Sequence, residues 1–148
     1  MEEVKKYLKE LGYEEKEIEE IINDYALVRL KPETLIKNIK RNYNYLIELG
    51  YSRAEIIKMT KSLPGIYGLS IENMEQKIEN MEKLGYSRED IIKMTKSLPT
   101  IYGLSIENMQ KKIEDMEKLG YSKADIIKMT KSWPSIYGHS IENIQKKI

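Results

Sequence analysis

A segment of 35 residues occurs three times in succession in this chain and dictates its architecture. The copies begin at Leu49, Leu84 and Leu119, and the first two differ at only six positions. Self-similarity at such a period is typical of proteins built from stacked repeats. A unit of this size cannot bury its own apolar side, so each copy has to pack against its neighbours. The period therefore predicts a repeat array.

The middle copy, residues 84–118, shows how the first half of each unit is expected to fold. Ser87 is a favourable N-cap, and Asp90 supplies the acidic first turn that a helix N-terminus favours. Pro99 ends this first helix because the residue before a proline is disfavoured in the helical region. An amphipathic stripe lies between these signals and consists of Ile91, Met94, Thr95 and Leu98.

The second half of the unit follows the proline. Pro99 to Tyr102 is one turn long, and we expect a 3₁₀ helix that ends at Gly103. Ser105 then caps a second helix, whose inward stripe is Ile106, Met109, Ile113 and Met116. Gly85 and Gly120 are predicted left-handed C-terminal caps, with Tyr86 and Tyr121 packing just beyond them. Each unit thus reads as helix, proline turn, helix and glycine.

Residues 1–48 diverge from this pattern, although Leu11-Gly12-Tyr13 matches Leu49-Gly50-Tyr51. We expect a short helix over residues 2–10, a second over about 14–24, and a third that begins at Pro32. Terminal repeats have one face in solvent, which favours a capping role. The predicted organisation is an N-terminal helix with a diverged capping repeat, two full repeats and a truncated C-terminal repeat, over residues 1–48, 49–83, 84–118 and 119–148.

The amino-acid composition limits the kinds of catalytic and binding site that the chain can contain. The sequence contains no Cys and one histidine, His139, so it offers no disulfide, thiol nucleophile or Cys-based metal site. Without a glycine-rich phosphate loop, a nucleophile set or a ligand cluster, we expect no enzymatic activity and no cofactor. The net charge of +1 gives no global argument for nucleic acid, but the balance is −2 over residues 1–48 and +3 over 49–148.

The chain shows no sign of targeting or membrane insertion. Its N-terminal stretch is too acidic for a transit peptide and lacks the apolar run of a signal sequence. No segment approaches the ~20 apolar residues of a membrane-spanning helix. We expect a soluble protein in the cytoplasm or otherwise inside the cell.

The proline and the apolar positions after it carry a family resemblance. Apolar residues lie three, ten and seventeen positions after Pro64, Pro99 and Pro134: Tyr67, Met74 and Met81, then Tyr102, Met109 and Met116, then Tyr137 and Ile144. With the Leu-Gly-Tyr-Ser segment that opens each unit, this pattern resembles the repeat of the mitochondrial transcription termination factor (mTERF) family. The resemblance is strong over residues 49–148 and weaker over 11–48.

The resemblance implies a fold and a function. The fold is an all-α solenoid of three-helix units, curved into a superhelix. In that family a concave, positively charged face binds nucleic acid, usually double-stranded DNA and in some members RNA, in the regulation of transcription.

Lysines in register are the first candidate for such a face. The first helix of each copy carries two lysines three positions apart, and repetition places them along one edge of the array: Lys58 and Lys61, Lys93 and Lys96, and Lys128 and Lys131. A regular row of cations can follow phosphates. Lys111 and Lys146, on the second helices, are candidate secondary contacts. The alternative is an ordinary solvated helix face, where lysines near a helix C-terminus also favour the dipole.

The residue after the proline is the second candidate. It varies within an otherwise fixed frame as Gly65, Thr100 and Ser135, which suggests one readout residue per repeat. We favour neutral drift instead, because these small residues are interchangeable in a turn. The tyrosines three positions after each proline are expected in the core and not in base stacking.

We therefore expect an mTERF-like array that binds nucleic acid, double-stranded DNA more than RNA, through a lysine-lined face. The alternatives are a protein-interaction solenoid and a structural or designed scaffold without a nucleic-acid ligand. Charges of both signs alternate along the second helices, as in Lys111 and Lys112 followed by Glu114 and Asp115, which favours the protein-interaction alternative.

Overall fold

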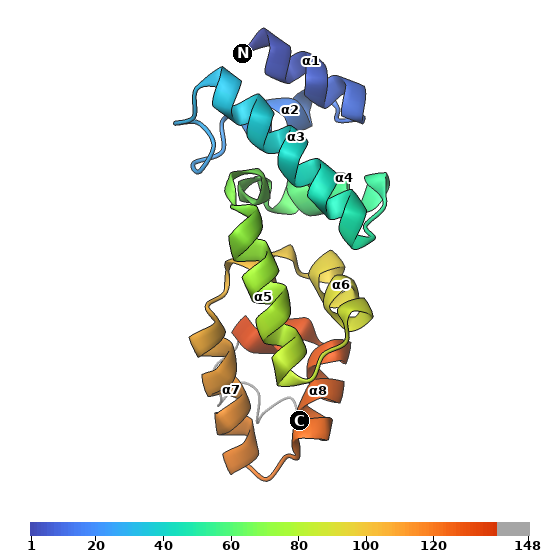
Figure 1. The fold of residues 1–148 in the computed structure, drawn as a ribbon, viewed down its shortest axis with the longest axis vertical. Coiled ribbons are helices and arrows are strands. Elements are labelled where there is room, and N and C mark those ends of the chain that lie inside the picture. Colours follow the sequence, from blue (N-terminus) through green and yellow to red (C-terminus); the bar gives the residue numbers. More distant parts are fainter. Residues whose placement is uncertain (139–148) are drawn as a thin grey trace. The chain divides into compact units, whose positions relative to one another are not determined.

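The computed structural model describes residues 1–138, and the regular elements in this range are all helices (Figure 1). This confirms the predicted all-α class. The chain divides into two compact units, Met1–Glu75 and Gln76–Ile148, each with its own buried apolar side chains. His139, Ile144 and Lys146, which figured in the sequence analysis, lie outside the described residues.

The first unit contains the diverged repeat and the start of the regular ones. Helix α1 packs against α2 and α3, while α4 packs against α2, α3 and η1. Helix α5 (Ile71–Leu84) begins in this unit and continues into the second. The other elements are α1 (Glu2–Leu11), α2 (Glu15–Ile22), α3 (Pro32–Leu49), α4 (Arg53–Ser62) and the 3₁₀ helix η1 (Pro64–Gly68).

The second unit has the element order of the regular repeats, whereas in the first unit no 3₁₀ helix separates α2 from α3. Helix α6 packs against α8, and α7 packs against α8 and η3. Each first helix is followed by a 3₁₀ helix that starts at the proline, as predicted from the sequence. The elements are α6 (Arg88–Ser97), η2 (Pro99–Gly103), α7 (Ile106–Lys118), α8 (Lys123–Ser132) and η3 (Pro134–Gly138).

Helix α6 begins at the predicted cap. The Ser87 hydroxyl accepts a hydrogen bond from the backbone N–H of Asp90 at 3.1 Å. The Asp90 carboxylate in turn accepts the backbone N–H of Ser87 at 3.3 Å. This reciprocal pair satisfies two N–H groups that have no partner within the helix. Helices α4 and α8 begin with the same arrangement at Ser52 and Ser122.

The predicted apolar stripes are buried, with two differences. Helix α6 ends at Ser97, so Leu98 leaves the helix with φ −138° and is only half-buried. Ile106, at the first position of α7, is also half-buried. The rest of the two stripes lies in the core: Ile91, Met94 and Thr95 of α6, and Met109, Ile113 and Met116 of α7.

Helix α2 is shorter than the expected span of about 14–24. It ends at Ile22, where the Glu19 carbonyl oxygen accepts both the backbone N–H of Asn23 at 3.1 Å and the Asn23 side-chain amide at 2.9 Å. The Asp24 carboxylate then accepts the backbone N–H of Ala26 at 2.9 Å and starts the loop. Local side-chain hydrogen bonds of this kind compete with helix continuation.

Buried hydroxyl groups join consecutive repeats within each unit, and the sequence analysis did not predict this. The Tyr13 hydroxyl lies 2.5 Å from both the Thr60 hydroxyl and the Tyr67 hydroxyl. The second unit contains the matching set, Tyr86, Thr130 and Tyr137. Burial is the main cause that raises the pKa of Tyr13 and Tyr67. The tyrosines after the prolines are therefore core residues, as expected.

Candidate nucleic-acid interface

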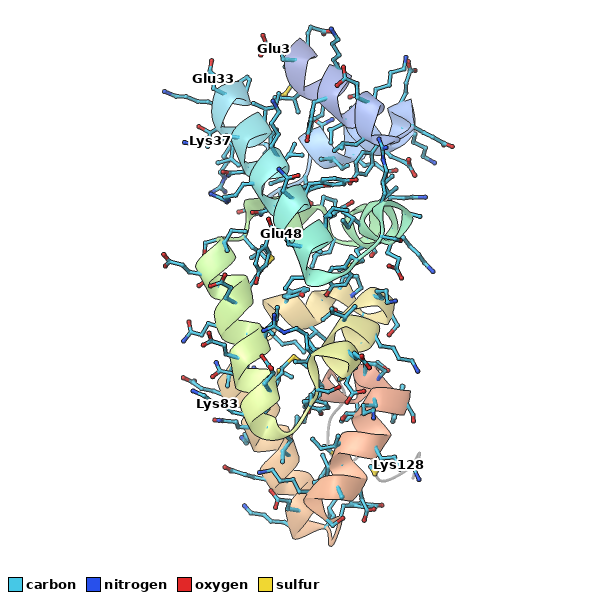
Figure 2. The ribbon with its side chains drawn as sticks, turned by 45° about the vertical axis from the view of Figure 1, so that its right-hand side comes forward. Glu3, Glu33, Lys37, Glu48, Lys83 and Lys128 are labelled. Atoms are coloured by element: carbon cyan, nitrogen blue, oxygen red, sulfur yellow. The ribbon has the colours of Figure 1, made fainter. Side chains whose placement is uncertain are left out.

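The first lysine of each predicted pair lies on the solvent side of its helix. Lys58 on α4, Lys93 on α6 and Lys128 on α8 are all exposed, and Figure 2 shows Lys128 on the outer side of α8. Among the described residues, none of the three takes part in an ion pair. They are therefore the cations of the predicted row that are available to an anionic ligand.

Helices α6 and α8 bring two of these lysines to one cleft of about 230 Å³. Lys93 comes from α6, and Lys128 and Lys131 come from α8, while Asp90 is the acidic group in the lining. Three cations and one carboxylate leave this cleft with an excess of two positive charges. In the second unit the structure thus brings three of the predicted lysines to one cleft, and their contact with nucleic acid stays a prediction.

The second lysine of two of the predicted pairs forms an ion pair within the chain. Lys131 Nζ lies 3.2 Å from Asp90 Oδ1 on the preceding first helix. In the first unit, Lys61 Nζ lies 2.7 Å from Glu17 Oε2, again on the preceding first helix. Both contacts follow from the packing of α4 against α2 and of α8 against α6. Lys61 and Lys131 therefore already have anionic partners within the chain.

These ion pairs contribute to shifts in the pKa values of Glu17, Lys61 and Asp90. The backbone N–H of Glu14 and the Lys61 ammonium lower the pKa of Glu17, and Glu17 raises the pKa of Lys61. Burial raises the pKa of Asp90, but hydrogen bonds from Ser87 and the Lys131 ammonium outweigh this, so the net pKa lies below its ordinary value. The carboxylates are thus held in their charged form.

Lys96 and Lys111 are not among the residues that line the cleft between α6 and α8. Lys96 is half-buried on α6. Lys111 is exposed on α7 and lines a cleft of about 410 Å³ together with Lys112, Asn108 and Asp115. Lys146 lies outside the described residues. Lys111 therefore lines a different cleft from the one between α6 and α8.

The proposed readout residues sit at the second position of each 3₁₀ helix. Thr100 is exposed, whereas Gly65 and Ser135 are half-buried. A methyl group at Gly65 would lie 3.8 Å from the Ala26 Cβ atom, which is an ordinary contact distance. The turn therefore accepts any small residue here, in agreement with neutral drift.

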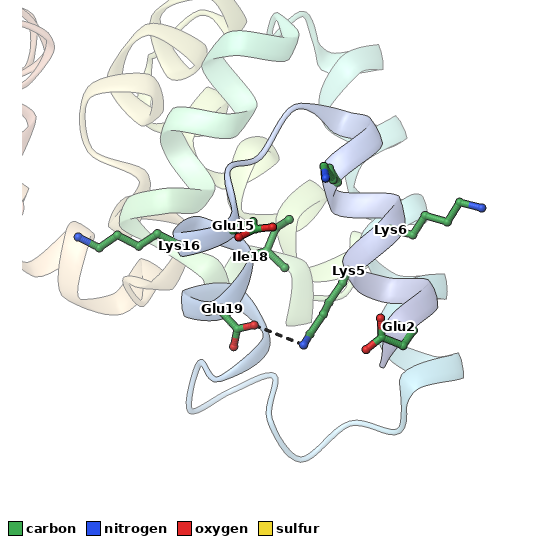
Figure 3. Close-up of a pocket in the computed structure, with 8 residues that line it drawn as sticks. Glu2, Lys5, Lys6, Glu15, Lys16, Ile18 and Glu19 are labelled. Carbon is green, nitrogen blue, oxygen red and sulfur yellow. Dashed lines mark ion pairs between the residues drawn. The ribbon is translucent and has the colours of Figure 1, made fainter.

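A second charged surface lies between α1 and α2 in the first unit. This cleft of about 530 Å³ is lined by both signs of charge, including Lys5, Lys6 and Lys16 with Glu15 and Glu19. Lys5 Nζ pairs with Glu19 Oε1 at 3.4 Å, and Lys6 and Lys16 point away from each other (Figure 3). Four lysines and three glutamates line this cleft, so its excess is one positive charge, against two between α6 and α8.

Within residues 1–138, no three His, Cys, Asp or Glu side chains are grouped so that they could hold a metal ion. In the same range, no helix combines the length and the apolar character needed to cross a membrane.

Comparison with known proteins places these features in a family. The model of the mTERF family matches residues 1–148, which is the whole chain. No curated protein matches the sequence.

Proposed function

Because this chain belongs to the mTERF family, we propose that it is a non-enzymatic repeat protein that binds duplex DNA through the phosphate backbone. Family membership suggests nucleic-acid binding in general. The observation that carries the more specific proposal is the cleft between α6 and α8, where Lys93, Lys128 and Lys131 outnumber the single carboxylate of Asp90.

The proposed primary contacts are Lys58, Lys93 and Lys128. They occupy the same position in three consecutive copies, they are exposed, and they make no ion pair within the described residues. A lysine ammonium acts as a flexible point charge, which suits contacts with phosphate more than the reading of base edges. The proposed secondary contacts are Lys111 and Lys146.

The burial of the repeated tyrosines supports a backbone contact. Proteins that bind single strands without sequence preference stack bases on aromatic side chains. Tyr67, Tyr102 and Tyr137 are buried, so the tyrosine that follows each proline is not available for stacking. Exposed lysines at the same position of each repeat instead suit contacts with the phosphates of a duplex.

Fluorescence anisotropy with labelled duplex DNA and single-stranded RNA, each at several salt concentrations, tests this proposal. Replacement of Lys58, Lys93 and Lys128 together by alanine should weaken duplex binding equally for all sequences. It should lower the slope of log affinity against log salt by up to about 2.7, because each phosphate contact contributes about 0.9.

A matched control removes the same charge elsewhere. Lys37, Lys83 and Lys118 are exposed lysines on α3, α5 and α7, and their replacement by alanine should leave the salt slope unchanged. Equal losses in the two triple variants would indicate an effect of net charge alone and would contradict the proposed contacts. Tighter binding of the RNA probe would contradict the choice of duplex DNA.

A protein-interaction role is the second candidate. It is supported by the α1–α2 cleft of about 530 Å³, which is lined by both lysine and glutamate side chains. Mixed charges favour selective contact with a protein partner of complementary pattern more than with a uniformly anionic polymer. Failure of both nucleic-acid probes to bind at low salt would favour this candidate.

A further inference from the structure

Two carboxylates of the first helices each serve two roles at once. One oxygen of Asp90, Oδ2, accepts the backbone N–H of Ser87, and the other, Oδ1, pairs with Lys131 Nζ at 3.2 Å. In the first unit, Glu17 Oε1 accepts the backbone N–H of Glu14 at 2.8 Å and Glu17 Oε2 pairs with Lys61 Nζ at 2.7 Å. The two units thus contain the same arrangement with different acids.

This arrangement fixes the carboxylate before any ligand arrives. The capping hydrogen bond holds the acid in the first turn of its helix, so little additional side-chain entropy is lost when it binds lysine. The Asp90 side chain is 23% exposed and the Lys131 side chain 42% exposed, so the pair remains open to solvent and to competition. A carboxylate oxygen of the protein therefore pairs with the Lys131 ammonium group in the way that a phosphate oxygen would.

We propose that Asp90 and Glu17 act as internal phosphate mimics that withhold Lys131 and Lys61 from nucleic acid and so limit its affinity. This inference rests on the proposed function, since it concerns the same row of lysines. It assigns different roles to the first and the second lysine of a first helix. Lys93 and Lys128 contact phosphate directly, whereas Lys131 contacts it only when Asp90 is removed or neutralised.

The chain contains a control for this proposal. Asp125 occupies the position of Asp90 in the next copy and caps α8 in the same way, since it accepts the backbone N–H of Ser122 at 3.4 Å. Within the described residues Asp125 has no lysine partner. Asp90→Asn and Asp125→Asn therefore remove the same charge from the same kind of cap, but only the first releases a lysine.

The test measures anisotropy of labelled duplex DNA with wild type, D90N, D125N, K131A and the D90N/K131A double variant over a salt series. D90N should bind about two- to fivefold more tightly than D125N, the size of effect that a surface ion pair has. Its salt slope should steepen by about 0.9, the value of one more phosphate contact. K131A should cancel both changes in D90N and should affect wild type less.

Each failure has a distinct signature. Equal gains in D90N and D125N would overturn the inference, because net charge alone would explain them. Equal losses from K131A in wild type and in D90N would also overturn it, because Lys131 would then be free already. Absence of binding by wild type and D90N at low salt would overturn the proposed function itself. Circular dichroism checks the fold, and E17Q with K61A provides the same cycle in the first unit if D90N unfolds.

Discussion

The hydroxyl groups of Tyr13, Thr60 and Tyr67 show how single residues hold consecutive repeats together. All three side chains are buried, and each phenol has to find a partner inside the core. Tyr13 belongs to the glycine cap of one repeat, while Thr60 and Tyr67 belong to α4 and η1 of the next. The Tyr13 hydroxyl thus forms hydrogen bonds with two elements of the next repeat.

Tyr13→Phe should destabilise the protein by about 1–3 kcal/mol, because it removes the hydroxyl that is hydrogen-bonded to both Thr60 and Tyr67. Thr60 keeps its bond to the Ile56 carbonyl oxygen at 2.8 Å. Urea unfolding followed by circular dichroism measures it. Tyr25→Phe is the control, because the Tyr25 side chain is 78% exposed and should change stability by less than about 0.5 kcal/mol.

The glycine that ends each second helix sets the direction of the chain into the next first helix. Gly85 has φ 114° and Gly120 has φ 102°, a region that favours glycine. The two differ in their surroundings. A Cβ atom on Gly85 would lie 3.0 Å from the Ile127 Cδ1 atom of α8, whereas one on Gly120 would meet no atom within 4 Å.

Three glycine-to-alanine variants should separate the cost of left-handed backbone strain from the cost of a steric contact with Ile127. Gly120→Ala should cost about 1–2 kcal/mol from the left-handed backbone alone. Gly85→Ala should cost more, because the Ile127 side chain also has to move. Gly103→Ala has neither problem and should be neutral or slightly stabilising. Thermal unfolding of the three variants gives the order, and equal costs at Gly85 and Gly120 would show that the Ile127 contact does not matter.

Over the chain as a whole, acidic and basic residues nearly cancel. The net charge is +1, so the triple change of Lys58, Lys93 and Lys128 to alanine makes it −2. With so small a net charge, long-range attraction contributes little, and binding depends on the local excess of lysine. This is why the control variants for the DNA experiments carry the same total charge.

Acid should destabilise the folded chain partly through Glu17 and Asp90. Both have a pKa below the ordinary value when folded. Their contribution is fully present above the unfolded pKa of about 4 and is lost as the pH falls through the folded pKa. Melting temperatures measured between about pH 2 and 7 should therefore fall less steeply in an E17Q/D90N variant than in wild type. An identical pH profile would contradict this.

The local architecture follows from the amino-acid sequence alone, because the signals for helix starts and ends act within a few residues. Serine caps, prolines and glycines mark where helices start and stop, and the stripes of Ile91 and Met109 identify the buried sides. Copying one unit then repeats each signal at the same spacing. The lysine row could be predicted in the same way, since Lys58, Lys93 and Lys128 occupy equivalent positions.

The side chains that meet across repeats could not be predicted from the sequence, because they depend on tertiary packing. The Tyr13 contact with Thr60 and the Glu17 contact with Lys61 join residues more than 40 positions apart, and they depend on how neighbouring first helices pack. The one signal in the sequence is that Asp90 precedes Lys131 by 41 residues, as Glu17 precedes Lys61 by 44. That spacing predicts an ion pair only once α6 is known to pack against α8. Local preferences fix the elements, but side-chain partners are chosen by packing.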